Sequence, residues 1–144
     1  MKRKRMGGAG QGLGVLPLLL VLGGTVALAQ MAGNPDAELK TALAHAGYAS
    51  KADALPGVHL HLHHVLNCMV GPQDKLFDAA AGNPCKDQGN GALVNLKGKM
   101  DAPYYTAALV AQIAKQGIDA TSLTEAKTDA HVASLILQDA TTAK

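Results

Sequence analysis

Apolar residues recur at intervals of three and four positions through four segments of this chain, and that spacing constrains its fold more than any other feature. Alanine is abundant, and β-branched residues do not gather in alternating runs. The chain has only three tyrosines, one phenylalanine and no tryptophan. Because this composition favours helices over strands, the sequence predicts an all-α fold.

The first two predicted helices are bounded by start and stop signals. Asn34 is typical of an N-cap, so the first helix is expected to cover roughly 36–53. Pro56 marks the following break, and the second helix is expected to cover roughly 57–70 and to stop at Gly71. These two segments form the first helix pair.

The second helix pair follows a longer connection. Asp101 is expected to cap a third helix, which starts at Pro103 and ends at Gly117. Ser122 begins the fourth helix, because its hydroxyl and the Glu125 carboxylate match a capping box that satisfies free amides of the first turn. Four helices with short connections, except one, predict an antiparallel four-helix bundle.

The N-terminal segment has the three parts of a secretory signal peptide. Four consecutive basic residues are followed by an apolar run, 13–22, and by the small-x-small cleavage signal Ala27-Leu28-Ala29. The apolar stretch is short for a membrane span and is interrupted by Pro17, which argues against the alternative of an uncleaved anchor. We therefore expect an exported, periplasmic protein.

Cleavage would remove residues 1–29 and leave 30–144 as a single domain. The loss of four basic residues takes Lys+Arg from 13 to 9 against 11 Asp+Glu, so the formal net charge moves from +2 to −2. No basic patch then remains to suggest a nucleic-acid partner, and no polybasic stretch suggests an anionic membrane. We expect no nucleic-acid binding and no stable membrane insertion after cleavage.

The chain has two cysteines, Cys68 and Cys85. Because exported compartments are usually oxidising, we predict a disulfide between them, closing a loop of about 17 residues at a gain of about 3 kcal/mol. The bond would tie down the irregular connection 71–101 between the second and third helices, which is long for a compact domain unless it is functional. The alternative is that one or both thiolates bind a metal ion.

Four of the six histidines of the chain lie within six positions. On a helical wheel, His59 and His63 lie one turn apart beside the apolar stripe of the second helix, and this spacing lets two imidazoles reach one metal ion. His61 falls on the other flank with Cys68, and His64 points most nearly to solvent. The sequence thus predicts His59 and His63 as the main metal ligands, with His61 and His64 as secondary ones.

Further donors come from other segments. His45 in the first helix and His131 in the fourth lie at the edges of their apolar stripes, and edge positions meet across helices in a bundle. Asp53 and Asp129 are candidates to complete the coordination shell. Zn²⁺ takes about four ligands in a tetrahedron, and Cu²⁺ prefers nitrogen-rich tetragonal sites. The expected ion is therefore Cu or Zn.

Catalytic motifs do not stand out. The chain has no His-Glu-x-x-His, and the predicted second helix carries no carboxylate that could act as a general base. We therefore expect a binding protein and not an enzyme. Three alternatives remain open: a bis-His haem protein, a cell-envelope interaction or structural module that binds a partner protein through the 71–101 loop, and a polar histidine face with incidental metal affinity.

A spaced pattern covers most of the predicted mature chain and consists of His59-x-His-x-His-His-x-x-Asn-Cys68, Gly71-Pro72, Phe77-Asp78 and Asn83-Pro84-Cys85. It resembles small exported bacterial proteins of undetermined function, which implies no assigned activity. The histidines and alanines of the first and fourth helices are also similar to small His-rich periplasmic metal-binding helical bundles, although those have more histidines outside one helix. The second resemblance supports metal binding, and we expect the protein to store, buffer or transfer a transition-metal ion.

Overall fold

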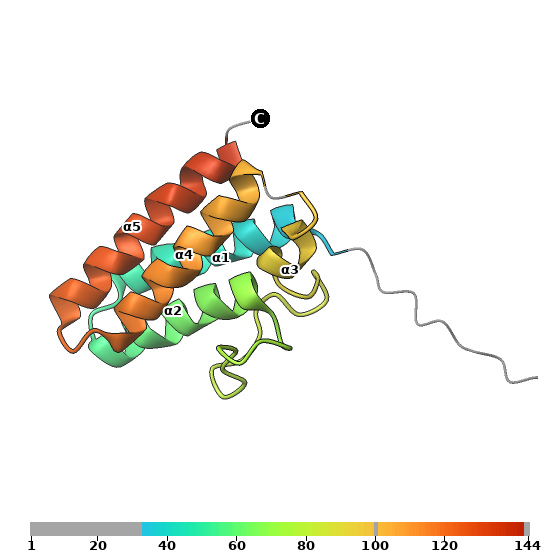
Figure 1. The fold of residues 1–144 in the computed structure, drawn as a ribbon. Coiled ribbons are helices and arrows are strands. Elements are labelled where there is room, and N and C mark those ends of the chain that lie inside the picture. The colour runs from blue at the N-terminus through green and yellow to red at the C-terminus, as the bar shows by residue number, and fades with distance from the viewer. Residues whose placement is uncertain (1–32, 100, 143–144) are drawn as a thin grey trace, which may run out of the picture.

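The computed structural model describes residues 33–99 and 101–142, and all regular elements in that part of the chain are helices (Figure 1). The all-α prediction is confirmed, whereas the expected signal peptide, 1–29, lies outside the described residues. No helix found there is long and apolar enough to cross a membrane. The helices are α1 (Pro35–Lys51), α2 (Leu55–Val70), α3 (Ala92–Leu96), α4 (Ala102–Asp119) and α5 (Leu123–Thr142).

Side chains cap two of the helices as predicted. The Asn34 side-chain oxygen accepts a hydrogen bond from the Ala37 N–H at 3.0 Å at the start of α1. The Ser122 hydroxyl accepts one from the Glu125 N–H at 3.2 Å at the start of α5, which is the first half of the capping box. Asp101 stands at the N-cap of α4 but makes no side-chain capping bond, so its predicted capping role is wrong.

Helix α4 does not end at Gly117, as the sequence suggested, but continues to Asp119. A Cβ atom at Gly117 would lie 2.6 Å from Leu62 Cδ1 and 3.0 Å from Asp129 Cβ. Helices α2 and α5 therefore approach α4 too closely at this point for any larger residue. The glycine permits close packing here and is not a helix stop.

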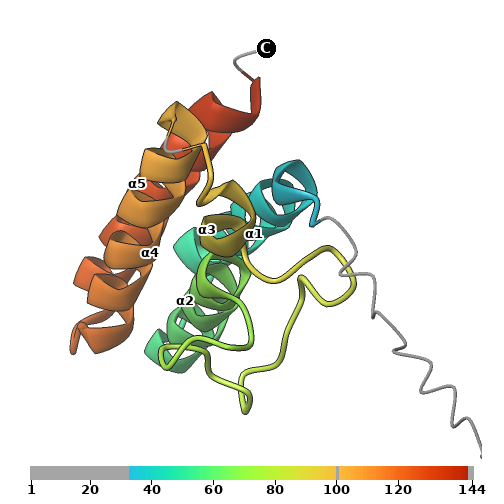
Figure 2. The same ribbon diagram turned by 45° about the vertical axis from the view of Figure 1, so that its right-hand side comes forward.

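The four long helices form a closed series of neighbours. Helix α1 packs against α2 and α5, and α4 packs against the same two helices. In Figure 2, α4 and α5 stand side by side, with α1 and α2 beside them. The small residues Ala42, Ala46, Ala126 and Ala130 are fully buried on α1 and α5, and the larger core side chains include Leu62, Leu66, Met69 and Leu137. Alanine faces let the α1 and α5 backbones come close, and α2 supplies much of the apolar volume.

The connection between α2 and α4 is not wholly irregular, which corrects the sequence-based expectation, because it contains α3. The buried Glu38 carboxylate of α1 anchors this region. It accepts hydrogen bonds from the Gly91 N–H at 2.8 Å and from the Asn95 side-chain amide at 2.7 Å. Burial raises the pKa of Glu38, and these two hydrogen bonds oppose the rise. A buried polar contact on α1 therefore positions α3, which the apolar periodicity could not reveal.

The predicted disulfide is present. Cys68 in the last turn of α2 is bonded to Cys85, with 5.4 Å between their Cα atoms. Phe77, between them in the chain, is half-buried against the core. Because both sulfurs are used in this bond, the alternative of cysteine thiolates as metal ligands is wrong. The bond ties the long connection to α2.

The packing at Gly117 generates a prediction with a matched control. Replacing Gly117 with alanine should lower the free energy of unfolding by about 1–3 kcal/mol, because the new methyl group overlaps Leu62. The Gly47→Ala change in α1 has open space around it and should raise stability by about 0.5–1 kcal/mol. Urea denaturation followed by circular dichroism measures both. Stabilisation by both substitutions would contradict the close α2–α4–α5 contact.

Candidate metal centre

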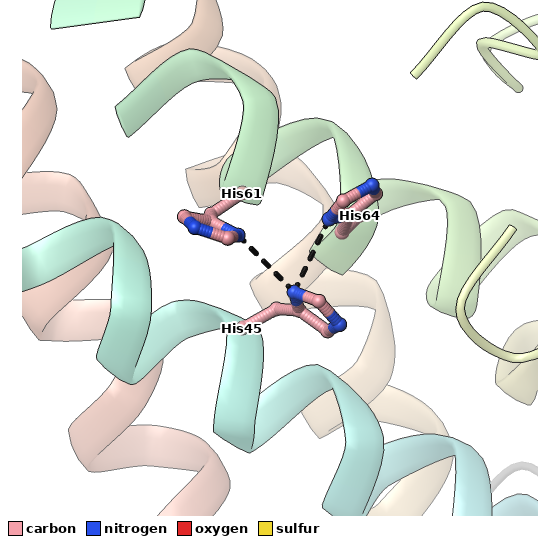
Figure 3. A group of neighbouring side chains, drawn as sticks. All are labelled: His45, His61 and His64. Carbon is pink, nitrogen blue, oxygen red and sulfur yellow. Dashed lines mark hydrogen bonds between the residues drawn. The ribbon is translucent and has the colours of Figure 1, made fainter. Parts of the chain in front are cut away.

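Three histidines from two helices meet at one place: His45 from α1, and His61 and His64 from α2 (Figure 3). His45 Nδ1 lies 3.2 Å from His61 Nδ1 and 3.2 Å from His64 Nδ1. One ligand nitrogen of each ring lies within 4.8 Å of those of the other two, and all three residues are half-buried. This histidine triad has the donor set of a metal site.

The core stripe of α2 sets the direction of two of these rings. Leu62 and Val65 are fully buried, and each directly follows a triad histidine. His61 and His64 are three residues apart, so they lie on the same side of α2, at the edge of the stripe that adjoins α1. The i, i+3 spacing places both nitrogens toward the same point.

The third ring, His45, comes from α1, whose buried face consists largely of alanine. Ala42, Ala46 and Ala49 are fully buried, and their small size brings the α1 backbone close to its neighbours. His45 directly precedes Ala46, and its ring faces both of the α2 rings in Figure 3. Tyr48, one turn before the end of α1, is 56% exposed, with its ring centroid 5.6 Å from that of His45. The triad therefore lies at the protein surface beside an exposed phenol ring.

A backbone carbonyl fixes the tautomer of one ring. His64 Nε2 lies 2.7 Å from the carbonyl oxygen of Ala81. A carbonyl oxygen only accepts, so Nε2 must carry the hydrogen, and in the neutral ring Nδ1 keeps its lone pair. That lone pair faces His45 Nδ1, as a ligand to a shared ion requires. Metal-binding histidines commonly donate their other N–H to a carbonyl in this way.

The spacing between the nitrogens suits a transition-metal ion. Two metal–nitrogen bonds of about 2.05 Å that enclose about 100° span the observed 3.2 Å. This angle lies between the tetragonal and tetrahedral values, so small side-chain movements adapt the site to Cu²⁺ or to Zn²⁺. With three protein donors, a fourth position would remain for water or another ligand.

Electrostatics favours the neutral rings that metal binding needs. Burial, together with the nearby His64 and His61, lowers the pKa of His45 to about 4. Burial and then His64 also lower the pKa of His61. Two of the three rings therefore hold no extra proton at neutral pH. A metal ion at this position would replace the hydrogen bonds that His45 makes with His61 and His64 by coordination bonds.

The other predicted histidines lie elsewhere and do not belong to the triad. His59 Nε2 lies 3.0 Å from the Ala120 carbonyl oxygen, and His63 Nδ1 lies 3.4 Å from Asp78 Oδ2. His131 is exposed on α5. The two residues predicted as the main pair thus have protein partners in other directions. His64, expected to point to solvent, is instead half-buried in the cluster, because the α2–α3 connection covers it.

Neither of the suggested carboxylates is grouped with the triad. Asp53 is exposed in the turn between α1 and α2. Asp129 is half-buried on α5, where burial and then the charge of Glu125 raise its pKa. Its Cβ lies near Gly117, at the contact with α4. The three-nitrogen cluster has no carboxylate member among the described residues.

No protein-family model matches the chain, and no curated protein or solved structure shows significant similarity to it.

The lowered pKa of His45 predicts a pH-dependent stability. Between pH 6.5, its ordinary value, and about 4, the unfolded chain takes up a proton that the folded chain does not. The contribution of His45 to the free energy of unfolding is therefore largest above pH 6.5 and falls as the pH is lowered toward 4. Urea midpoints at pH 7 and pH 4.5 should show wild type losing more stability than His45→Gln, and equal losses would contradict the lowered pKa.

Proposed function

We propose that this protein is an exported carrier or buffer for a transition-metal ion, Cu or Zn, which it binds through His45, His61 and His64. The convergence of three imidazole nitrogens, 3.2 Å apart at the two His45 contacts, is the observation that carries the proposal. The half-buried position supports reversible loading from solvent. The fourth coordination position, filled by water or an exchanging ligand, supports delivery of the ion as cargo.

The surroundings of the site support the proposed location and scaffold. The disulfide is compatible with an oxidising exported compartment, and the predicted signal peptide would direct the chain to the periplasm. We propose an antiparallel four-helix bundle as the scaffold, and the packing of α1 and of α4 against both α2 and α5 supports it. The resemblance to small His-rich periplasmic metal-binding bundles agrees with storage, buffering or transfer. We propose a binding role without catalysis.

Substitution of the triad tests the proposed site. Wild type should bind Zn²⁺ or Cu²⁺ with micromolar or tighter affinity, as measured by competition with a chromophoric chelator. The His45→Ala/His61→Ala/His64→Ala variant should bind more than about 100-fold more weakly, because it lacks all three nitrogens. The matched control is His59→Ala/His63→Ala/His131→Ala, which removes the same number of histidines. Equal loss in both variants would reject the triad as the site.

A haem-binding role fits the arrangement less well than an ion-binding role. The three ring centroids lie 4.5 to 5.7 Å apart, so the rings are in mutual contact. A bis-His haem needs a planar macrocycle between two axial ligands. The observed contacts leave no such gap inside the cluster. Haem addition should therefore give no Soret band that depends on the triad.

One observation favours the second candidate, an interaction module of the cell envelope. A groove of about 800 Å³ lies along α4, and its lining includes Tyr104 of α4 together with Leu76 and Leu93 of the connection. Leu76 is 41% exposed. If partner binding were the main role, Leu76→Asp would abolish the protein's activity in the cell. The variant that lacks all three triad histidines would keep that activity. The ion-carrier proposal predicts the reverse.

A further inference from the structure

The segment 78–85 of the α2–α3 connection is attached to α2 beside the triad. Asn67, a buried residue of α2, donates from its side-chain amide to the carbonyl oxygens of Asp78 and Gly82, both at 2.7 Å. Its side-chain oxygen accepts the Asp78 N–H at 2.9 Å. A single buried amide thus holds both ends of the stretch 78–82.

Two further contacts secure the same segment. His63 faces the Asp78 carboxylate, with 3.4 Å between Nδ1 and Oδ2. The disulfide from Cys68 to Cys85 closes the far end, one turn beyond His64 on α2. Both cysteines are buried, so the covalent link is shielded while the segment stays docked. His63 and Cys68 of α2 therefore both contact the segment 78–85.

The docked segment touches a proposed metal ligand directly. The Ala81 carbonyl, within the stretch held by Asn67, accepts the His64 Nε2 hydrogen at 2.7 Å. This contact orients the ring so that Nδ1 faces His45. If the segment left α2, His64 would lose this hydrogen bond at Nε2 and could rotate away from the cluster. His45 and His61 make no such contact with the segment.

We propose that the Cys68–Cys85 disulfide controls the metal centre: the closed bond keeps His64 in place as the third ligand, and reduction weakens ion binding by releasing segment 78–85. This inference rests on the proposed function. It assigns roles to Asn67 and the disulfide as positioning groups, since neither reaches the ion. Loss of outer contacts of this type typically weakens metal affinity 10- to 100-fold.

The chemical step requires a reductant of the dithiol class. One thiolate of the dithiol attacks a sulfur of the protein disulfide and forms a mixed disulfide, and the second thiolate then displaces the protein cysteine. Two electrons and two protons pass to the protein, which gains two thiols, and the dithiol becomes a disulfide. Because the bond is buried, the attack requires the segment to open first.

Linkage makes the effect reciprocal. If docking of the segment favours ion binding, ion binding must favour docking by the same free energy. A bound ion should then protect the disulfide from reduction. This consequence can be measured on the unmodified protein.

The first test compares Zn²⁺ affinities of folded variants. Cys68→Ser/Cys85→Ser should bind Zn²⁺ at least about tenfold more weakly than wild type. In a His64→Ala background the same double substitution should change the affinity less than about twofold, because the ligand that the segment orients is already missing. A wild-type affinity in the double-serine variant, or an unchanged tenfold loss in the His64→Ala background, would overturn the proposal.

The second test needs no altered disulfide. Wild-type protein is treated with a phosphine reductant, with and without saturating Zn²⁺, and free thiols are counted over time by mass spectrometry. Reduction should slow at least about tenfold with Zn²⁺ in wild type and be unaffected by Zn²⁺ in His64→Ala. Asn67→Ser should accelerate reduction and weaken Zn²⁺ binding together. Equal reduction rates with and without Zn²⁺ in wild type would overturn the proposal even if the serine variants do not fold.

The two proposals fail in different ways. Absence of Zn²⁺ and Cu²⁺ binding to oxidised wild type would reject the proposed function and this inference with it. Tight binding to wild type that is indifferent to the disulfide, to Asn67 and to reduction would leave the ion carrier intact and reject only the redox control.

Discussion

The close packing of α1 against α2 is the contact on which the rest of the structure depends. Buried alanines on α1 bring its backbone near α2, and only at that distance can His45 meet His61 and His64. Two histidines three residues apart on one helix make a weak chelate by themselves. The third ring, from a segment sixteen residues earlier than His61, turns a local sequence pattern into a tertiary donor set.

The connection between α2 and α4 completes this arrangement from outside. Glu38 anchors its later part at α3, and Asn67 with the disulfide anchors its earlier part on α2. Between those anchors the Ala81 carbonyl reaches His64. A long loop in a small helical protein is thus held at several points by buried polar contacts, and one of those points coincides with the proposed metal site.

Much of the fold could be predicted from the sequence, because helix periodicity and caps such as Asn34 and Ser122 are local signals. The disulfide was also predictable, since the chain has only two cysteines. Which histidines of α2 cluster with His45 could not be predicted. A helical wheel shows that His59 and His63 share one flank of α2 and His61 another, but it does not show which flank faces α1. The i, i+4 rule therefore favoured one pair, whereas the packing of α1 selected His61 and His64. The prediction that Gly117 ends a helix was wrong for a related reason. The glycine permits close packing against Leu62 and α5, which are distant in the sequence.

The most direct measurement of the central claim is a long-range ¹H–¹⁵N NMR spectrum of the imidazole rings during titration with Zn²⁺. It reports, for each histidine, which nitrogen carries hydrogen and which binds the ion. We predict that His45, His61 and His64 all coordinate through Nδ1 with hydrogen on Nε2, and that the spectra of His59, His63 and His131 do not change at one equivalent. Coordination shifts at His59 and His63, or none at the triad, would contradict the account.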